Sequence, residues 1–146
     1  MKLGVCVPYR NRELHLNEFI PRVGKYLKEQ GIDFQMYFCH QVDDKLFNRG
    51  ATKNIAAKHA IEDGCDYVVF HDIDMIPEKD GGADYTFPKK APRHIATQIS
   101  QMDYRLKYHE YFGGAVLFSK EQLEKTNGYS NDYWDWGMED DDLFWR

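Results

Sequence analysis

The sequence predicts a single α/β domain with a mixed, mostly parallel β-sheet flanked by helices, and three observations favour this fold class. The length of 146 residues suits one domain with a sizeable core. Apolar runs alternate with amphipathic segments in the order strand, helix, strand, helix, strand, which is typical of βαβ units. Polar clusters follow these runs, at the sheet edge where open α/β folds bind their ligands.

Each element has its own signal along the chain. The apolar run Leu3–Val7 predicts a buried strand that ends at Pro8, because proline has no amide hydrogen for the ladder. Gly31, Gly64 and Asn127 stand where helices are expected to end. We expect further strands at 33–41, 65–74, 94–100 and 111–120, helices at 13–31, 47–64, 120–128 and from 139 onward, and a surface loop at 77–93.

Composition narrows the class of protein. Hydrophobic residues make up 42% and charged residues 29%, as in soluble globular domains, and the net charge of −5 disfavours nucleic acid as a partner. The first apolar run is too short for a signal peptide or a membrane span. Cys6, Cys39 and Cys65 lie in or beside strand-like runs and are expected to be buried free thiols. We therefore expect a cytoplasmic chain without a membrane segment.

Two carboxylates follow the apolar run YVVF at Asp72 and Asp74. Residues i and i+2 share a face of an extended strand, so both side chains would lie near one point. Hard oxygen ligands of this kind suit Mg²⁺ or Mn²⁺ beside a phosphate. The alternative is a pair of solvated loop acids, and the pattern alone leaves both interpretations open.

Basic groups occur in two further motifs. PYRNR carries Arg10 and Arg12, whose guanidinium groups could bind phosphate or could be ordinary surface side chains. In FNRG, Arg49 could reach a phosphate, while Phe47 could stack on a base or staple the start of a helix. Neither motif decides between these alternatives by itself.

Four acids stand in a row from Glu139 to Asp142, directly behind WDWGM. One acid is ordinary at the start of a helix, where the helix dipole favours negative charge. The remaining acids exceed what capping requires. One carboxylate near a metal-bound diphosphate could act as general base toward a hydroxyl nucleophile.

In combination, these motifs resemble the β-1,4-galactosyltransferase family. PYRNR, FNR, FHDID, YFGG, SKEQ, NGYSNDYWDWG and EDDD follow in the family's order from about Val5 onward. The closely similar N-acetylgalactosaminyltransferases share most of these motifs. The resemblance implies a single Rossmann-like domain of the GT-A type over residues 1–146. It also implies a UDP-sugar donor, a saccharide or glycan acceptor, Mn²⁺ as cofactor, and inversion at the anomeric carbon.

The resemblance also implies roles for individual residues. Asp140 is expected to be the catalytic base and Asp74 the metal ligand. Tyr111 stands where the family uses tyrosine to prefer galactose over its N-acetylated form, and Trp136 where a mobile-loop tryptophan closes over the donor. Acceptor contacts are expected at Tyr108, Met138, Glu139 and Asp141. Donor contacts are expected at Pro8, Tyr9, Arg10, Asn11, Arg12, Phe47, Asn48, Arg49, Asp72, Ile73, Tyr111, Gly114 and Trp136.

The sequence differs from the family pattern in two respects. The family has glycines at the positions of Asp135 and Met138, where side chains would restrict a hinge. Its further metal ligands, a methionine and a histidine, lie on a segment after the acids. The given sequence ends at Arg146, so we expect weaker metal affinity. Two alternatives to a galactosyltransferase stay open: transfer from UDP-N-acetylgalactosamine, and a non-catalytic nucleotide-sugar or glycan-binding module.

Overall fold

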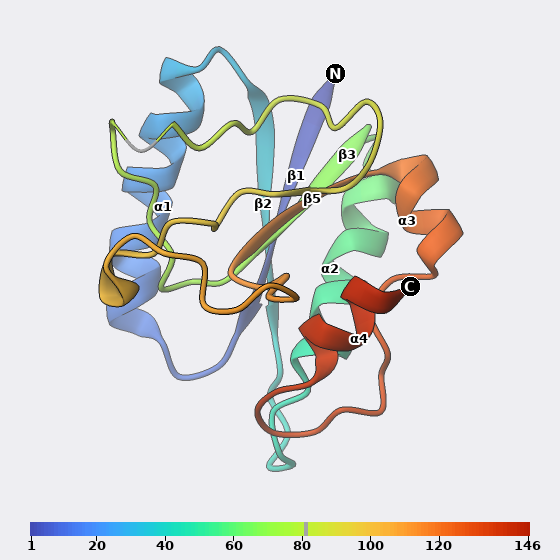
Figure 1. Cartoon of the computed structure of the whole chain (residues 1–146). Helices are drawn as coiled ribbons and strands as arrows, with labels where there is room; N and C mark the ends of the chain where they lie inside the picture. Colours follow the sequence, from blue (N-terminus) through green and yellow to red (C-terminus); the bar gives the residue numbers. More distant parts are fainter. Residues whose placement is uncertain (81) are drawn as a thin grey trace.

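The computed structural model describes residues 1–80 and 82–146, which form one five-stranded sheet with helices on both faces (Figure 1). The strands lie in the order β2-β1-β3-β5-β4. In chain order the elements are β1 (Lys2–Tyr9), α1 (Glu13–Glu29), β2 (Asp33–His40), α2 (Arg49–Glu62), β3 (Tyr67–His71), β4 (Arg93–His94), the short 3₁₀ helix η1 (Ser100–Met102), β5 (Ala115–Ser119), α3 (Lys120–Thr126) and α4 (Glu139–Trp145).

The sheet is mixed, as predicted. Strands β1, β2 and β3 are parallel, whereas β5 is antiparallel to β3 and β4 is antiparallel to β5. His71 at the end of β3 pairs with Ala115 at the start of β5. The carboxyl end of β5 therefore lies at the opposite edge. The polar clusters still meet at one edge, as expected, because Arg49 and Lys53 contact Glu139 and Asp140. The acids reach that edge through α3 and the loop that precedes α4.

The strand bounds differ from the prediction, and β5 begins only at Ala115 rather than at residue 111. Strand β1 continues through Pro8 to Tyr9, because β1 pairs with β3 only as far as Cys6 and Pro8 has a ladder neighbour on one side alone. Strand β3 ends at His71, where the chain turns. The strand expected at 94–100 is reduced to the two residues of β4.

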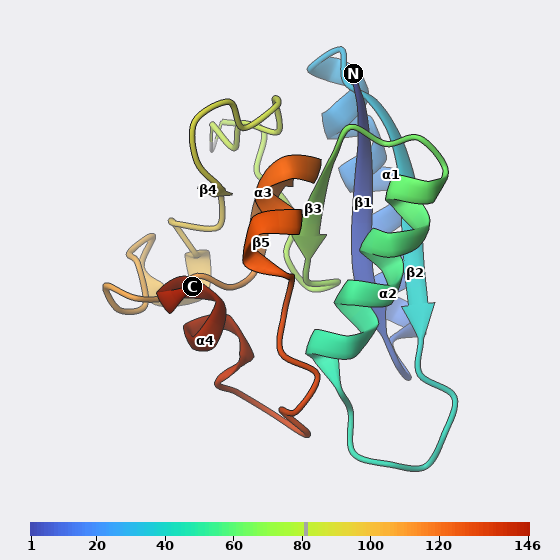
Figure 2. The ribbon, with the colours of Figure 1, turned by 90° about the vertical axis from the view of Figure 1, so that its right-hand side faces the viewer.

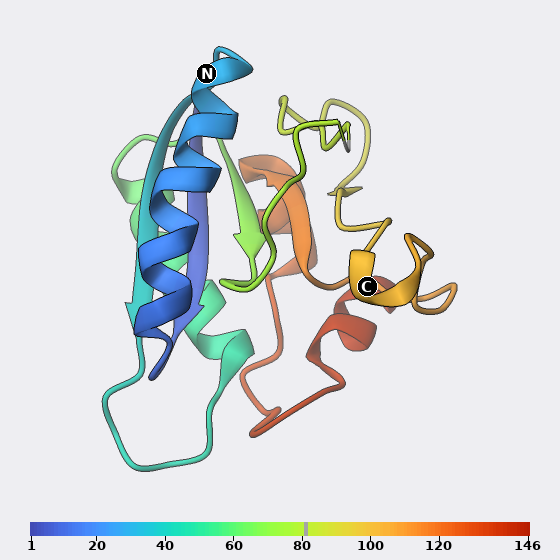
Figure 3. The same cartoon turned by 90° about the vertical axis from the view of Figure 1, so that its left-hand side faces the viewer.

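Two apolar cores lie on opposite faces of the sheet. Successive residues of a strand point to opposite faces, so Leu3 and Val5 belong to the core beneath α1, while Cys6 belongs to the core beneath α2. Figure 3 shows α1 in front of the sheet, and Figure 2 shows α2 and α3 on the other side. Helix α4 joins the second core through Leu143, which is 3% exposed.

The segment 77–93 was expected to be a surface loop, yet it contributes one fully buried side chain. Tyr85 is 1% exposed, and its hydroxyl lies 2.8 Å from Nε2 of His71. The two rings stack with centroids 5.9 Å apart. The loop therefore closes the α1 side of the core at the end of β3.

The helix ends expected from the sequence are confirmed. Gly31, Gly64 and Asn127 end their helices with φ of +69°, +85° and +58°. The three cysteines are free and Cys6 and Cys65 are buried, as expected, whereas Cys39 is only half-buried. No helix within the described ranges is long and apolar enough to cross a membrane.

Gly4 allows β1 and α2 to pack closely, so Gly4→Ala should destabilise the fold. A Cβ at Gly4 would lie 2.6 Å from Cβ of Ala60, so helix α2 must move. We expect the free energy of unfolding to fall by about 1–3 kcal/mol, measured by urea denaturation.

Gly24→Ala is the matched control inside α1. Its Cβ would meet only Phe34 and Met36, at 3.7 and 3.8 Å, so we expect a gain of about 0.5–1 kcal/mol from helix propensity. Equal unfolding midpoints for the two variants would contradict the close packing of β1 against α2.

Candidate active site

Helix α2 presents two cations at the carboxyl edge of the sheet. Arg49 and Lys53 are four residues apart and so lie on one face of the helix. The start of the helix is held by Asn48, whose side chain accepts from the Ala51 amide at 2.8 Å and donates to the Asn131 carbonyl at 2.7 Å. The helix start is thereby tied to the loop before α4.

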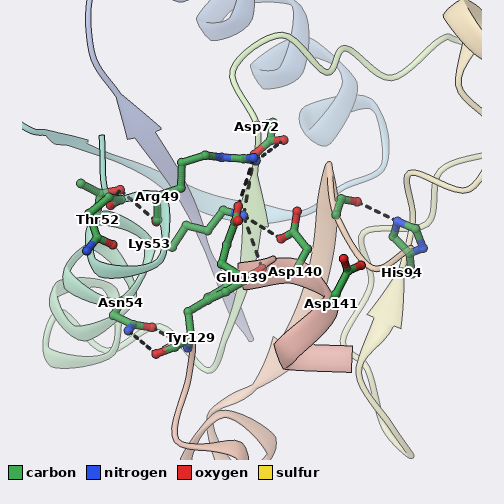
Figure 4. Close-up of polar contacts among 12 residues, drawn as sticks. Arg49, Thr52, Lys53, Asn54, Asp72, His94, Tyr129, Glu139, Asp140 and Asp141 are labelled. Carbon is green, nitrogen blue, oxygen red and sulfur yellow. Dashed lines mark hydrogen bonds and ion pairs between the residues drawn. The ribbon is translucent and has the colours of Figure 1, made fainter. Parts of the chain in front are cut away.

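Arg49 joins β3 to α4. Its Nη2 donates to both carboxylate oxygens of Asp72, at 2.7 and 2.6 Å, and its Nη1 lies 3.1 Å from Oε1 of Glu139 (Figure 4). Glu139 is 2% exposed, and its Oε1 lacks hydrogen-bond geometry to any donor within the described residues. Burial alone would lower the pKa of Arg49, but the surrounding carboxylates raise it. Burial alone would raise the pKa of Asp72, but Lys53 and Arg49 hold that pKa below its usual range.

Lys53 is a site residue that the sequence analysis missed. It is 1% exposed, and its Nζ lies 3.2 Å from Oδ1 of Asp140, 3.8 Å from Oδ1 of Asp72 and 3.5 Å from the hydroxyl of Tyr129. By contrast, the apolar Ile55 two residues further along the same helix is 49% exposed. The spacing of Lys53 from Arg49 was the available signal. We call Arg49, Lys53, Asp72, Glu139 and Asp140 the charge cluster.

The glycine pair Gly113–Gly114 makes room for the charge cluster. A Cβ at Gly113 would lie 2.5 Å from Oδ2 of Asp140 and 2.8 Å from the ring of Tyr111. Gly114 has φ of +76°, and its carbonyl accepts from the Asp72 amide at 2.7 Å. Gly113 thus leaves room for the Asp140 carboxylate, and the Gly114 carbonyl fixes the backbone of Asp72.

Aromatic side chains lie beside Asp140 and Asp141. The Tyr108 hydroxyl donates to Oδ1 of Asp141 at 2.6 Å, which raises the pKa of Tyr108 to about 12. The rings of Tyr108 and Tyr111 meet edge to face with centroids 5.6 Å apart. Burial is the main cause of the raised pKa of Tyr111. These residues form a partly exposed platform next to the acids.

Trp136 stands out from this platform. It is 78% exposed, and Nζ of Lys107 lies 5.2 Å from its ring centroid and 5.7 Å from that of Tyr111. On either side of Trp136, Asp135 and Met138 have φ of +74° and +73°, a region that favours glycine. The two positions where glycine was expected therefore hold strained side chains in this chain.

The expected donor residues at the end of β1 form a second group. Arg10 donates to the carbonyls of Lys45 and Asp43, at 2.7 and 2.6 Å, and its guanidinium lies 5.7 Å from the ring centroid of Phe47. Arg12 is exposed at the start of α1. Arg10 therefore holds the 43–45 loop, while Arg12 faces solvent.

The remaining expected donor residues lie in or next to the strands, and most of them are buried. Pro8 and Tyr9 are buried in β1, and Ile73 is buried at 7% exposure. Asn11 is exposed, with φ of +51° in the turn before α1.

Asp72 and Asp74 do not share one point, because the chain turns after His71. Asp72 joins the charge cluster, whereas Asp74 is exposed and lines a different space, a cavity of about 650 Å³. The nearby histidines are already hydrogen-bonded: His71 through both ring nitrogens, and His94 through Nε2 to the Gly113 carbonyl at 2.7 Å.

The described residues do not form a complete metal site. No group of three His, Cys, Asp or Glu in residues 1–80 and 82–146 could hold a metal ion. Asp74 is thus a single candidate ligand rather than part of a preformed site.

The fold and the charged edge define a glycosyltransferase domain of the GT-A class. The structure is similar to that of a mutant *Drosophila* β-1,4-galactosyltransferase 7 in complex with manganese, UDP-Gal and xylobiose, with a TM-score of 0.89 and 35% identity over 98% of this chain and 59% of that chain. It is equally similar to the catalytic domain of the same protein in complex with xylobiose, with a TM-score of 0.89 and 36% identity.

Sequence comparison identifies the family. Residues 1–86 match the N-terminal region of glycosyl transferase group 7, and residues 93–146 match a model described as the N-terminal domain of galactosyltransferase. The chain is 41% identical to β-1,4-galactosyltransferase 4 of *Cricetulus griseus*, covering 97% of this chain and 41% of the relative. It is 38% identical to human β-1,4-galactosyltransferase 1, covering 99% and 36%.

The chain belongs to the β-1,4-galactosyltransferase family, which confirms the resemblance seen in the motifs. It spans about two fifths of the length of the curated relatives it matches.

Arg49→Met should destabilise the chain strongly. The substitution leaves Asp72 and Glu139, whose side chains are 18% and 2% exposed, without their shared cation. Breaking a buried ion pair typically costs about 3–5 kcal/mol, and urea denaturation should measure this loss.

Arg22→Met is the control on the surface of α1. Arg22 pairs with Glu18 across one turn, and its side chain is 54% exposed, so we expect a change of about 0–1 kcal/mol. A similar small change for Arg49→Met would mean that the charge cluster does not stabilise the fold.

Proposed function

We propose that the chain belongs to an enzyme that transfers galactose from UDP-galactose to a sugar hydroxyl with inversion, and that Asp140 is the general base. The observation that carries this proposal is the position of Asp140. Its carboxylate lies between the cations of α2 and the Tyr108–Tyr111 platform, against the cradle of Gly113. The names of the relatives and the UDP-Gal in the *Drosophila* complex support the choice of donor.

The proposed reaction is a single displacement. The acceptor hydroxyl oxygen forms a bond to the anomeric carbon while the bond from that carbon to the β-phosphate oxygen breaks. The electron pair leaves with UDP, and the hydroxyl proton passes to Asp140. Attack from the face opposite the leaving group inverts the anomeric centre, so the mechanism requires no nucleophilic side chain.

The donor and the acceptor would bind at different groups of residues. We propose that the donor's uracil and diphosphate bind at the end of β1, where Phe47, Arg10 and exposed Arg12 supply a ring and two guanidinium groups. The acceptor would lie on the other side, on Tyr108 and Asp141, and the exposed Trp136 would close over the donor. The xylobiose in the *Drosophila* complex supports a saccharide as acceptor.

We propose Mn²⁺ as the cofactor because the *Drosophila* complex contains manganese. The described residues offer Asp74 as one ligand, so diphosphate oxygens, water or groups outside these residues would complete the coordination. When bound, the ion would neutralise charge on the diphosphate.

Asp140→Asn should lower the transfer rate by about 10²–10⁴-fold, because the amide cannot accept the hydroxyl proton. UDP binding should be nearly unchanged. A galactosyl-transfer assay with a panel of saccharide acceptors, run beside a UDP titration, measures both quantities.

Asp142→Asn is the matched control from the same acidic run. Asp142 pairs with Arg146 rather than with the charge cluster, so transfer should stay within about twofold. Unchanged transfer in Asp140→Asn would remove Asp140 as the base. UDP binding without transfer in the unsubstituted chain would favour the non-catalytic binding module. Faster transfer from UDP-N-acetylgalactosamine than from UDP-galactose would identify the former as the donor.

The affinity for UDP should depend on Mn²⁺. We expect calorimetry to show tighter binding with Mn²⁺ than with EDTA, and Asp74→Asn to weaken the metal-dependent part. The same affinity in Mn²⁺ and in EDTA would contradict both the cofactor and the role of Asp74.

A further inference from the structure

We propose that Lys53 is a positioning residue that orients the Asp140 carboxylate. The proposal rests on the proposed function, because it assigns Lys53 a task toward the general base. Lys53 is 1% exposed, and its Nζ lies 3.2 Å from Oδ1 of Asp140 (Figure 4). Figure 4 shows the side chain reaching from α2 toward α4, so the contact crosses between elements far apart in the sequence.

Burial of an ammonium group requires partners. Transfer of an unpaired charge from water into a protein interior is strongly unfavourable, so a buried lysine persists only where carboxylates and dipoles surround it. Lys53 has Asp140 at 3.2 Å, Asp72 at 3.8 Å, and the Tyr129 ring centroid at 4.5 Å. Among these neighbours Asp72 already binds Arg49 through both oxygens, which makes Asp140 the principal partner of Lys53.

The two oxygens of Asp140 are placed differently. Oδ1 is held by Lys53, whereas Oδ2 faces Gly113, where a Cβ would approach to 2.5 Å. The Tyr111 ring borders the same space, 2.8 Å from that Cβ position. Lys53 therefore directs Oδ2 toward the platform on which the acceptor is proposed to bind. A displacement of the base by about 1 Å can cost about 10²-fold in rate.

Lys53→Met removes the charge and keeps much of the side-chain length. We expect kcat to fall by about 10–100-fold, while KM for the donor and the UDP affinity stay within about threefold. Lys53→Arg should retain more activity than Lys53→Met, because it keeps a cation beside Asp140. The control is Lys58→Met on the exposed side of the same helix, where Lys58 is 72% exposed and kcat should not change.

Three kinetic outcomes would overturn the proposal. Unchanged kcat in Lys53→Met would show that the contact has no role in turnover. A rise in donor KM that accounts for the loss would place Lys53 in donor binding instead. Equal losses in Lys53→Met and Lys53→Arg would make side-chain shape, and not charge, the cause.

A thermal double-mutant cycle tests the same contact without any assay of activity. Lys53→Met and Asp140→Asn should each lower Tm, and the double variant should melt no lower than the less stable single variant, because both charges are then removed together. Additive losses would overturn the proposal. If Lys53→Met alone does not fold, a cooperative melt of the double variant supports the pairing, and its absence contradicts the pairing. The two claims can fail separately. If the melting temperatures are coupled but transfer does not depend on Asp140, the proposed function is rejected and the pairing of Lys53 with Asp140 stands.

Discussion

The charge cluster at the carboxyl edge joins α2, the end of β3 and the start of α4, which lie far apart in the sequence. Two cations on α2 face three carboxylates, one after β3 and two at the start of α4. Without α2, the buried Glu139 and the partly buried Asp140 would both lack a cationic partner. Because the cost of burying an unpaired charge is several kcal/mol, the position of α4, and with it the proposed base, depends on these ion pairs.

The reversed direction of β5 makes this arrangement possible. Since β5 is antiparallel to β3, its amino end lies beside the carboxyl end of β3. The glycine pair before β5 is thereby brought to the edge where β3 ends, and it leaves space that a side chain would fill. Helix α3 and the loop after it then return the chain to that edge, where α4 enters the gap. A fully parallel sheet would have placed the start of β5 at the opposite edge.

The segment around Trp136 combines strain with exposure. Asp135 and Met138 adopt a left-handed backbone conformation that costs a side-chain-bearing residue roughly 1 kcal/mol or more. Trp136 lies between them with most of its surface in solvent, held by Lys107 above its ring. The acids that follow contact the cations of α2, Glu139 through Arg49 and Asp140 through Lys53. The chain therefore changes within a few residues from an exposed, strained turn to a tightly held helix start, which suits a loop beside a rigid site.

The sequence by itself determined the fold class, the helix ends at Gly31 and Gly64, and the motifs that identify the family, because periodicity, capping and residue order are local properties. Only the tertiary structure decided that Asp72 and Asp74 face different spaces, because that depends on the turn after His71. It also decided that Lys53 is inside and Ile55 outside, against ordinary hydrophobicity, because carboxylates from β3 and α4 surround the lysine. Partners so distant in the chain leave no periodic signal, so charge compensation across elements appears only once the elements are in place.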